Sequence, residues 1–117
     1  MTNEAVFAMP LAKVYPLLEA KALRKGRTRE EVLAVIHWLT GYTGADIDRL
    51  IAGGVTYGDF FRRAPALHPA RARIRGSICG VSIEQIDDPL MQDIRRLDKL
   101  IDDLARGKPL EKLLPES

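Results

Sequence analysis

Apolar residues near the carboxyl end of the chain repeat at helical spacing. They follow one another in steps of four, three, four and three residues, at Leu90, Ile94, Leu97, Ile101 and Leu104. Asp88 is a favourable N-cap, and Pro89 suits the first helical position, where no backbone N–H is needed. Gly107 is a natural stop. The pattern predicts an amphipathic helix of about five turns that begins at Pro89.

Three earlier segments each begin with a threonine that can cap a helix. Thr28 is followed three residues later by Glu31, and Thr43 and Thr56 are followed by aspartates at the same spacing. Apolar residues at helical spacing come next in each segment, and a glycine or a proline then ends it. These signals predict helices over residues 29–40, 44–52 and 57–63.

A fourth run of apolar residues lies closer to the amino terminus and ends before Gly26. It consists of Leu11, Val14, Tyr15, Leu18 and Ala22. Pro16 lies inside this run and cannot donate a backbone hydrogen bond. Either the helix begins a residue or two after Leu11, or it kinks at Pro16. In both cases we expect it to end near Lys25.

In residues 65–88 the apolar positions repeat with neither helical nor strand periodicity. Residues 69–74 can form a short helical turn that starts with a proline, and glycines interrupt anything longer. Val81 and Ile83 alternate like a strand, whereas residues 82–85 suggest one capped turn. Because a lone strand cannot form a sheet, we expect an irregular and mostly buried link.

These patterns predict an all-α fold. We expect one domain over residues 1–117, built as a bundle of about five helices in which the last helix is the longest. One more turn is predicted over residues 110–114, and residues 1–9 and 115–117 are expected to be loosely ordered. A chain of 117 residues suits one domain and can bury about two-thirds of its unfolded surface.

Composition excludes several classes of protein. The single Cys excludes an internal disulfide framework and a multi-cysteine zinc site. No apolar run approaches the roughly 20 residues that span a bilayer, and the start of the chain lacks the features of a secretory signal. We therefore expect a soluble cytoplasmic protein with no cofactor. The net charge of +2 is too small to indicate nucleic-acid binding by itself.

Several short strings in the chain resemble one bacterial family. They lie at residues 13–17, 25–28, 38–42, 78–81, 88–92 and 97–101, and read KVYPL, KGRT, WLTGY, ICGV, DPLMQ and LDKLI. Together they resemble the family called domain of unknown function 2200 over about residues 7 to 114. The resemblance implies a small bacterial cytoplasmic protein and carries no catalytic residue or cofactor. One departure is His68, where the family is expected to have Asn before Pro69.

Cys79 is the weak candidate for catalysis. It lies between glycines, which could expose its thiol, but neither His37 nor His68 stands at a recognisable catalytic spacing from it. Burial as a small core residue explains it at least as well. Trp38 is interpreted as a half-buried aromatic beside a solvated His37, and the two histidines do not suggest a metal site.

The helix pair over residues 29–52 invites comparison with a helix-turn-helix motif. Its second helix carries Asp46 and Asp48 against Arg49 alone, which would repel the phosphates of a DNA groove. We therefore do not favour DNA reading by this unit.

Charge is unevenly placed along the chain. Residues 13–29 contain six basic residues and one acid, residues 60–80 contain five arginines and no acid, and residues 82–104 contain seven acids and three basic residues. Arginine forks match phosphate oxygens, so one hypothesis is a nucleic-acid or phosphate site. Its candidate residues are Arg62, Arg63, His68, Arg71, Arg73 and Arg75. The alternative, which we favour, is that the acidic last helix neutralises the basic segments within the fold.

The apolar face of the last helix is wider than the surface that one partner helix would cover. We expect most of it to face the other helices, and part of it to form an interface, which makes a homodimer a reasonable hypothesis. The interface candidates are Trp38, Leu90, Met91, Ile94, Leu97, Leu100, Ile101 and Leu104. The favoured function is accordingly a non-catalytic protein-interaction module, and the alternative is the phosphate or nucleic-acid binder.

Overall fold

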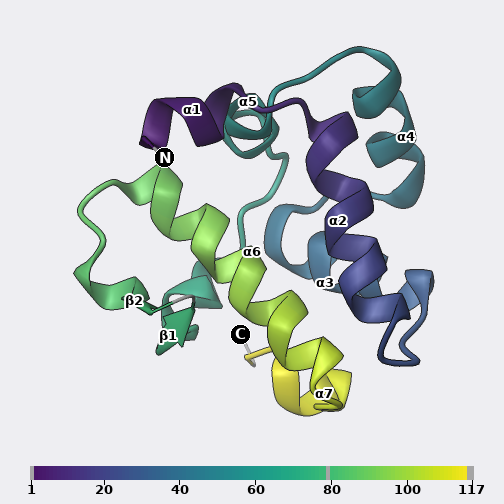
Figure 1. Cartoon of the computed structure of the whole chain (residues 1–117), viewed down its shortest axis with the longest axis vertical. Helices are drawn as coiled ribbons and strands as arrows, with labels where there is room; N and C mark the ends of the chain where they lie inside the picture. The colour runs from purple at the N-terminus through teal and green to yellow at the C-terminus, as the bar shows by residue number, and fades with distance from the viewer. Residues whose placement is uncertain (1, 79, 116–117) are drawn as a thin grey trace.

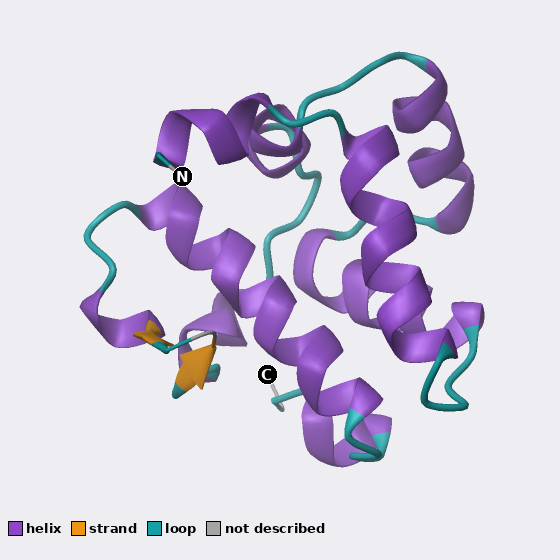
Figure 2. Cartoon of the chain, in the orientation of Figure 1, coloured by secondary structure: helices purple, strands orange, loops and turns teal. Residues whose placement is uncertain are grey.

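The computed structural model describes residues 2–78 and 80–115, so Cys79 lies outside the described residues. These residues form seven α-helices, two short 3-10 helices and one small hairpin (Figures 1 and 2). In chain order they are α1 (Asn3–Ala8), α2 (Leu11–Leu23), α3 (Arg29–Thr40), α4 (Gly44–Ala52), α5 (Tyr57–Arg62), η1 (Pro69–Arg73), β1 (Ser77–Ile78), β2 (Val81–Ser82), η2 (Ile83–Gln85), α6 (Pro89–Ala105) and α7 (Leu110–Leu113). The predicted mostly helical fold is confirmed.

Local capping chemistry sets the ends of the central helices. The Thr28 side chain accepts a hydrogen bond from the backbone N–H of Glu31, whose carboxylate accepts one in return from the backbone of Thr28. Thr43 and Asp46 form the same reciprocal box at the start of α4. Each box satisfies backbone donors that a helix start leaves unpaired, which is why the bounds predicted for these two helices match those observed.

The amino-terminal part differs from the prediction in two ways. Residues 3–8, expected to be loosely ordered, form the short helix α1, which Thr2 caps and which packs against α5. Helix α2 begins at Leu11 and runs through Pro16 without ending there. Pro16 is exposed, so the Ala12 carbonyl that loses its usual helical partner lies on the solvent side of the helix.

The link between α5 and α6 was predicted to be mostly buried, and this was wrong. Among its described residues only Ile74, Ile78 and Ile83 are buried. The predicted turn is present as η1, and both alternatives for the following stretch are partly realised. Val81–Ser82 is a strand whose partner is Ser77–Ile78, and a 3-10 turn follows it (Figure 2). The hairpin lies at the edge of the molecule, where its polar residues face water.

Helix α6 is the centre of the core. It packs against α2, α3 and α5, and also against α7, β1 and η2 (Figure 1). Asp88 caps it by accepting hydrogen bonds from the backbone N–H groups of Leu90 and Met91. The buried apolar side chains of the helix are Met91, Ile94, Leu97, Leu100, Ile101 and Leu104.

This burial leaves little of the predicted interface exposed. The six buried residues of α6 contact their own chain, because helices and the hairpin surround α6 on several sides. The apolar face is therefore wide because it has several intramolecular partners. Leu90 and Trp38 remain half-buried and pack against the same core.

Candidate anion-binding site

The arginines predicted to form one binding segment are separated by the fold. On α5, Arg62 and Arg63 pair with Asp59, at 2.9 Å and 3.5 Å between guanidinium nitrogen and carboxylate oxygen. Arg71 instead reaches α6, where its Nε lies 2.9 Å from Oδ1 of Asp93. The charge pattern predicts that α6 supplies the counter-charges, but for Arg62 and Arg63 the counter-charge is the neighbouring Asp59.

Arg71 belongs to a largely buried charged cluster. Asp93 Oδ1 accepts hydrogen bonds from Arg71 and also from Arg96, the latter at 2.8 Å. Arg71 further donates to the backbone carbonyl of His68. With only 6% of Asp93 exposed, this cluster ties η1 to α6 and does not offer its charges to solvent.

His68 has a structural role. Its Nδ1 accepts a hydrogen bond from the backbone N–H of Ala70 and so caps η1. Its ring stacks on Trp38 with the centroids 4.1 Å apart, and Trp38 is half-buried as the sequence predicted. His37 is exposed, and its Nδ1 lies 3.1 Å from the carbonyl oxygen of Tyr42.

The remaining two candidates, Arg73 and Arg75, line a hollow of about 200 Å³ between η1, α6 and α7. Three lysines from the carboxyl-terminal part of the chain also line this hollow: Lys99, Lys108 and Lys112. The one carboxylate in the lining is Asp103, which lies 3.2 Å from Lys99. This hollow thus brings together cations that are up to 39 positions apart in the sequence, from Arg73 to Lys112.

A second basic hollow, of about 870 Å³, lies between the carboxyl ends of α2 and α6. Its charged lining residues are Lys21, Arg24, Lys25, Arg106 and Asp102. Asp102 pairs with Lys21 at 2.9 Å and with Arg106 at 3.1 Å. The hydrogen bond from Lys21 is the main cause that lowers the pKa of Asp102.

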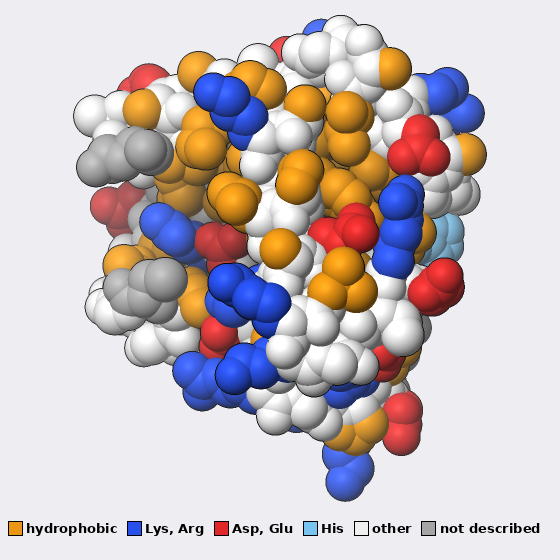
Figure 3. Space-filling view, turned by 45° about the vertical axis from the view of Figure 1, so that its right-hand side comes forward, with side chains coloured by type: hydrophobic (Ala, Val, Ile, Leu, Met, Phe, Trp, Pro, Cys, Tyr) orange, Lys and Arg blue, Asp and Glu red, His pale blue; other side chains and the backbone are white. Residues whose placement is uncertain are grey.

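The two hollows flank the last turns of α6, and together they form a surface that we call the basic end. Its cations are Lys21, Arg24, Lys25, Arg73, Arg75, Lys99, Arg106, Lys108 and Lys112. Nine cations against two carboxylates give this end a net charge of +7, whereas the whole chain carries +2, so all other residues together carry −5. In Figure 3, Lys and Arg side chains gather on the lower part of the face, the height at which α7 lies in Figure 1.

Part of this positive charge has an internal explanation. The carboxyl ends of α2 and α6 each carry about half a negative charge from their peptide dipoles, which nearby cations offset. That accounts for about one of the seven surplus charges. Among the described residues, the side chains of Arg24, Lys25, Lys108 and Lys112 make no hydrogen bond or ion pair. These four cations are available to an anion, whereas Arg73 already interacts with another group and Arg75 helps to lower the pKa of Glu84.

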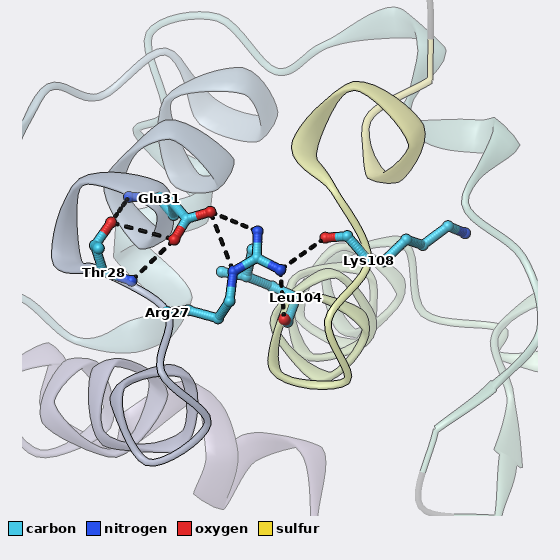
Figure 4. Close-up of polar contacts among 5 residues, drawn as sticks. All are labelled: Arg27, Thr28, Glu31, Leu104 and Lys108. Carbon is cyan, nitrogen blue, oxygen red and sulfur yellow. Dashed lines mark hydrogen bonds and ion pairs between the residues drawn. The ribbon is translucent and has the colours of Figure 1, made fainter.

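Arg27, next to the basic end, links the start of α3 to the last turn of α6 and to Lys108 (Figure 4). Its guanidinium donates to Glu31 at the start of α3 and to the carbonyl oxygens of Leu104, at 3.3 Å, and Lys108, at 3.1 Å. The Leu104 carbonyl also accepts a hydrogen bond from the backbone N–H of Gly107, so Arg27 adds a second donor there and links α3 to the turn that follows α6. The hydrogen bond from Arg27 is also the main cause that lowers the pKa of Glu31.

From the sequence alone, Arg27 is one basic residue of a basic segment. Its i,i+4 spacing from Glu31 is a signal that was available in the sequence. Its hydrogen bonds to the carbonyls of Leu104 and Lys108 span 77 and 81 positions, and no local pattern indicates such partners.

The other predicted chemistry is limited. Cys79 lies outside the described residues, and Asp88 caps α6. In the described parts of the chain, no three His, Cys, Asp or Glu side chains are grouped so that they could hold a metal ion. None of the described helices is both long enough and apolar enough to cross a membrane.

Comparison with known proteins extends this description. The crystal structure of uncharacterized protein SP1917 superimposes on this chain with a TM-score of 0.90. The two sequences are 52% identical, and the match covers 97% of this chain and 93% of that one. No curated protein matches the chain. The family of uncharacterized proteins conserved in bacteria, domain of unknown function 2200, matches residues 5–115, and the chain belongs to that family.

Proposed function

We propose that this protein binds nucleic acid through the phosphate backbone, using the basic end. The observation that carries the proposal is the segregation of charge: +7 at the basic end against −5 over all other residues. An extended polyanion can contact both hollows, and each phosphate that is neutralised releases counterions.

The lining chemistry favours phosphates over bases. Among the described residues of the two hollows there is no aromatic ring on which a base could stack and no side-chain amide that could read a base edge. Lysine and arginine bind phosphate oxygens whatever the base sequence. We therefore expect binding that is independent of sequence and steeply dependent on salt.

The protein-interaction module favoured by the sequence has less support. It rested on the apolar face of α6, and six of its eight candidate residues are buried in their own chain. The phosphate-binding alternative keeps only Arg73 and Arg75 from its original segment and gains seven other cations. The geometry therefore supports the second hypothesis better than the first.

The test is fluorescence anisotropy with a labelled RNA of about 20 nucleotides, titrated with the full chain at salt concentrations from about 50 to 300 mM. We expect the logarithm of the affinity to fall linearly with the logarithm of the salt concentration. Arg75→Glu should weaken binding at least about fivefold and lower the salt slope by about one. Lys112→Glu, an exposed residue of the same hollow, should do the same.

Arg63→Glu is the matched control, because it makes the same substitution in the same arginine segment but outside the basic end. It should leave the affinity within about a factor of two. The proposal fails if the wild-type chain does not bind the RNA at the lowest salt concentration. It also fails if Arg63→Glu weakens binding as much as the two variants of the basic end.

A further inference from the structure

The cations of the basic end that make no ion pair are divided equally between its two hollows. Arg24 and Lys25 line the larger hollow, and Lys108 and Lys112 line the smaller one. All four residues are exposed, and among the described residues their side chains make no hydrogen bond or ion pair. The basic end therefore offers two separate places where phosphates can bind.

The last turns of α6 separate the two hollows. Asp102 and the C-cap residue Arg106 line the larger hollow, whereas Lys99 and Asp103 line the smaller one. In Figure 1 the end of α2 lies on one side of α6, and the hairpin that follows Arg75 lies on the other. An α-helix with its side chains is about 10–12 Å across, so phosphates bound in the two hollows are separated by about that distance.

This spacing matches the two strands of a duplex. The major groove of B-form DNA is about 12 Å wide and admits an α-helix, and the phosphates of the two strands run along its edges. When the end of α6 lies at such a groove, each hollow faces a different strand.

The carboxylates on this part of α6 do not oppose the placement, because each already has a cation. Asp102 pairs with Lys21 at 2.9 Å and with Arg106 at 3.1 Å, and Asp103 pairs with Lys99 at 3.2 Å. The two aspartate side chains are only 17% and 19% exposed. Neither carboxylate is therefore left as an unpaired negative charge beside the phosphates.

The chemistry of the hollows disfavours a single strand. Proteins that bind single strands commonly stack the unpaired bases on aromatic side chains, and each stacked base strengthens binding. The described residues that line the two hollows include no aromatic ring. In a duplex the bases are already stacked on one another, so binding through phosphates leaves them undisturbed. A duplex also presents one negative charge per about 1.7 Å of axis, twice the density of either strand.

We propose that the basic end binds double-stranded nucleic acid across a groove, with the phosphates of one strand in each hollow and the end of α6 between the two strands. This inference rests on the proposed function and narrows its partner to a duplex. It also assigns Lys25 and Lys112 to different strands.

The first test compares a DNA duplex of about 20 base pairs with its separate single strands, by fluorescence anisotropy of the full chain at about 100 mM salt. We expect the duplex to bind at least about tenfold more tightly. A single strand that binds as tightly as the duplex overturns this inference and leaves nucleic-acid binding intact. A chain that binds neither overturns the proposed function as well.

Each hollow should contribute separately to duplex binding. Lys25→Glu in the larger hollow and Lys112→Glu in the smaller one should each weaken binding at least about fivefold, because each replaces an available cation by an anion. Lys13→Glu is the control, since Lys13 is also exposed but lines neither hollow, and its affinity should stay within about twofold of the wild type. A loss in only one of the two hollow variants overturns the two-strand arrangement.

A duplex with one uncharged strand tests the assignment of strands to hollows. Methylphosphonate linkages along one strand should weaken wild-type binding at least about fivefold, because one hollow then faces no charge. Lys112→Glu should bind this duplex within about twofold of its affinity for the unmodified one, because the uncharged strand can lie in the altered hollow. A wild-type affinity that the modification leaves unchanged means that both hollows contact one strand, and it overturns the proposal.

Discussion

At the scale of single residues, a few polar side chains connect parts of the fold that are far apart in sequence. Arg27 joins the start of α3 to the end of α6, and Asp93 holds two arginines between η1 and α6. Only 15% of the Arg27 side chain is exposed, so its hydrogen bonds are shielded from water. Charged groups with partly buried partners contribute more than exposed pairs.

Arg27→Met should therefore destabilise the fold by about 1.5–3 kcal/mol, because it leaves the carbonyls of Leu104 and Lys108 without this donor. Urea denaturation followed by circular dichroism measures the loss. Arg49→Met is the control: Arg49 pairs with Asp46, but its side chain is 72% exposed, and the expected cost is below about 0.5 kcal/mol. Equal losses in the two variants would contradict the role given to Arg27.

At the scale of elements, α6 is the helix on which most others pack, and its start depends on one side chain. Asp88 accepts two backbone hydrogen bonds, at 2.8 Å and 3.2 Å. Asp87 immediately before it is exposed. The two neighbouring aspartates therefore differ in role although they are chemically identical.

Asp88→Ala should cost about 1 kcal/mol and lower the melting temperature by roughly 3–6 °C, since the first turn of α6 loses its cap. Asp87→Ala should change the stability by less than about 0.5 kcal/mol. Thermal unfolding of both variants at neutral pH decides the matter. A larger loss for Asp87→Ala than for Asp88→Ala would contradict the capping described above.

At the scale of the whole molecule, all three tyrosines of the chain are buried. Burial raises the pKa of Tyr15 to about 12, raises that of Tyr42, and raises that of Tyr57 well above the ordinary value of 10.0. A group whose pKa is raised by folding stabilises the native state below its unfolded pKa, and that contribution is lost as the pH rises above it.

We therefore expect alkaline unfolding above pH 10.0, because only the unfolded chain ionises its tyrosines there. Absorbance of tyrosinate near 295 nm should appear together with the loss of helical circular dichroism. Tyr57→Phe removes a buried hydroxyl that has no partner, so it should be at least as stable at neutral pH and unfold at higher pH. Tyrosine ionisation near pH 10.0 with the helices intact would refute this account.

The sequence by itself determined α3, α4 and the start of α6, because the interactions that set these ends are local. Thr28 and Glu31, Thr43 and Asp46, and Asp88 with the two residues after Pro89 all act within one helical turn. Their spacing is visible in the chain, and the observed bounds of α3 and α4 follow from it. The hairpin partner of Val81–Ser82 was missed because two-residue strands carry no period.

Only the tertiary structure decided which surfaces and charges meet. Burial of six of the eight predicted interface residues depends on helices far away in sequence, whereas Leu90 and Trp38 stay half-buried. The basic end likewise consists of cations from four separate segments of the chain. The arginines of residues 62–75, which are neighbours in sequence, lie apart in the fold. Long-range pairing is set by how helices pack in space, and packing is a property of the assembled core that no local spacing encodes.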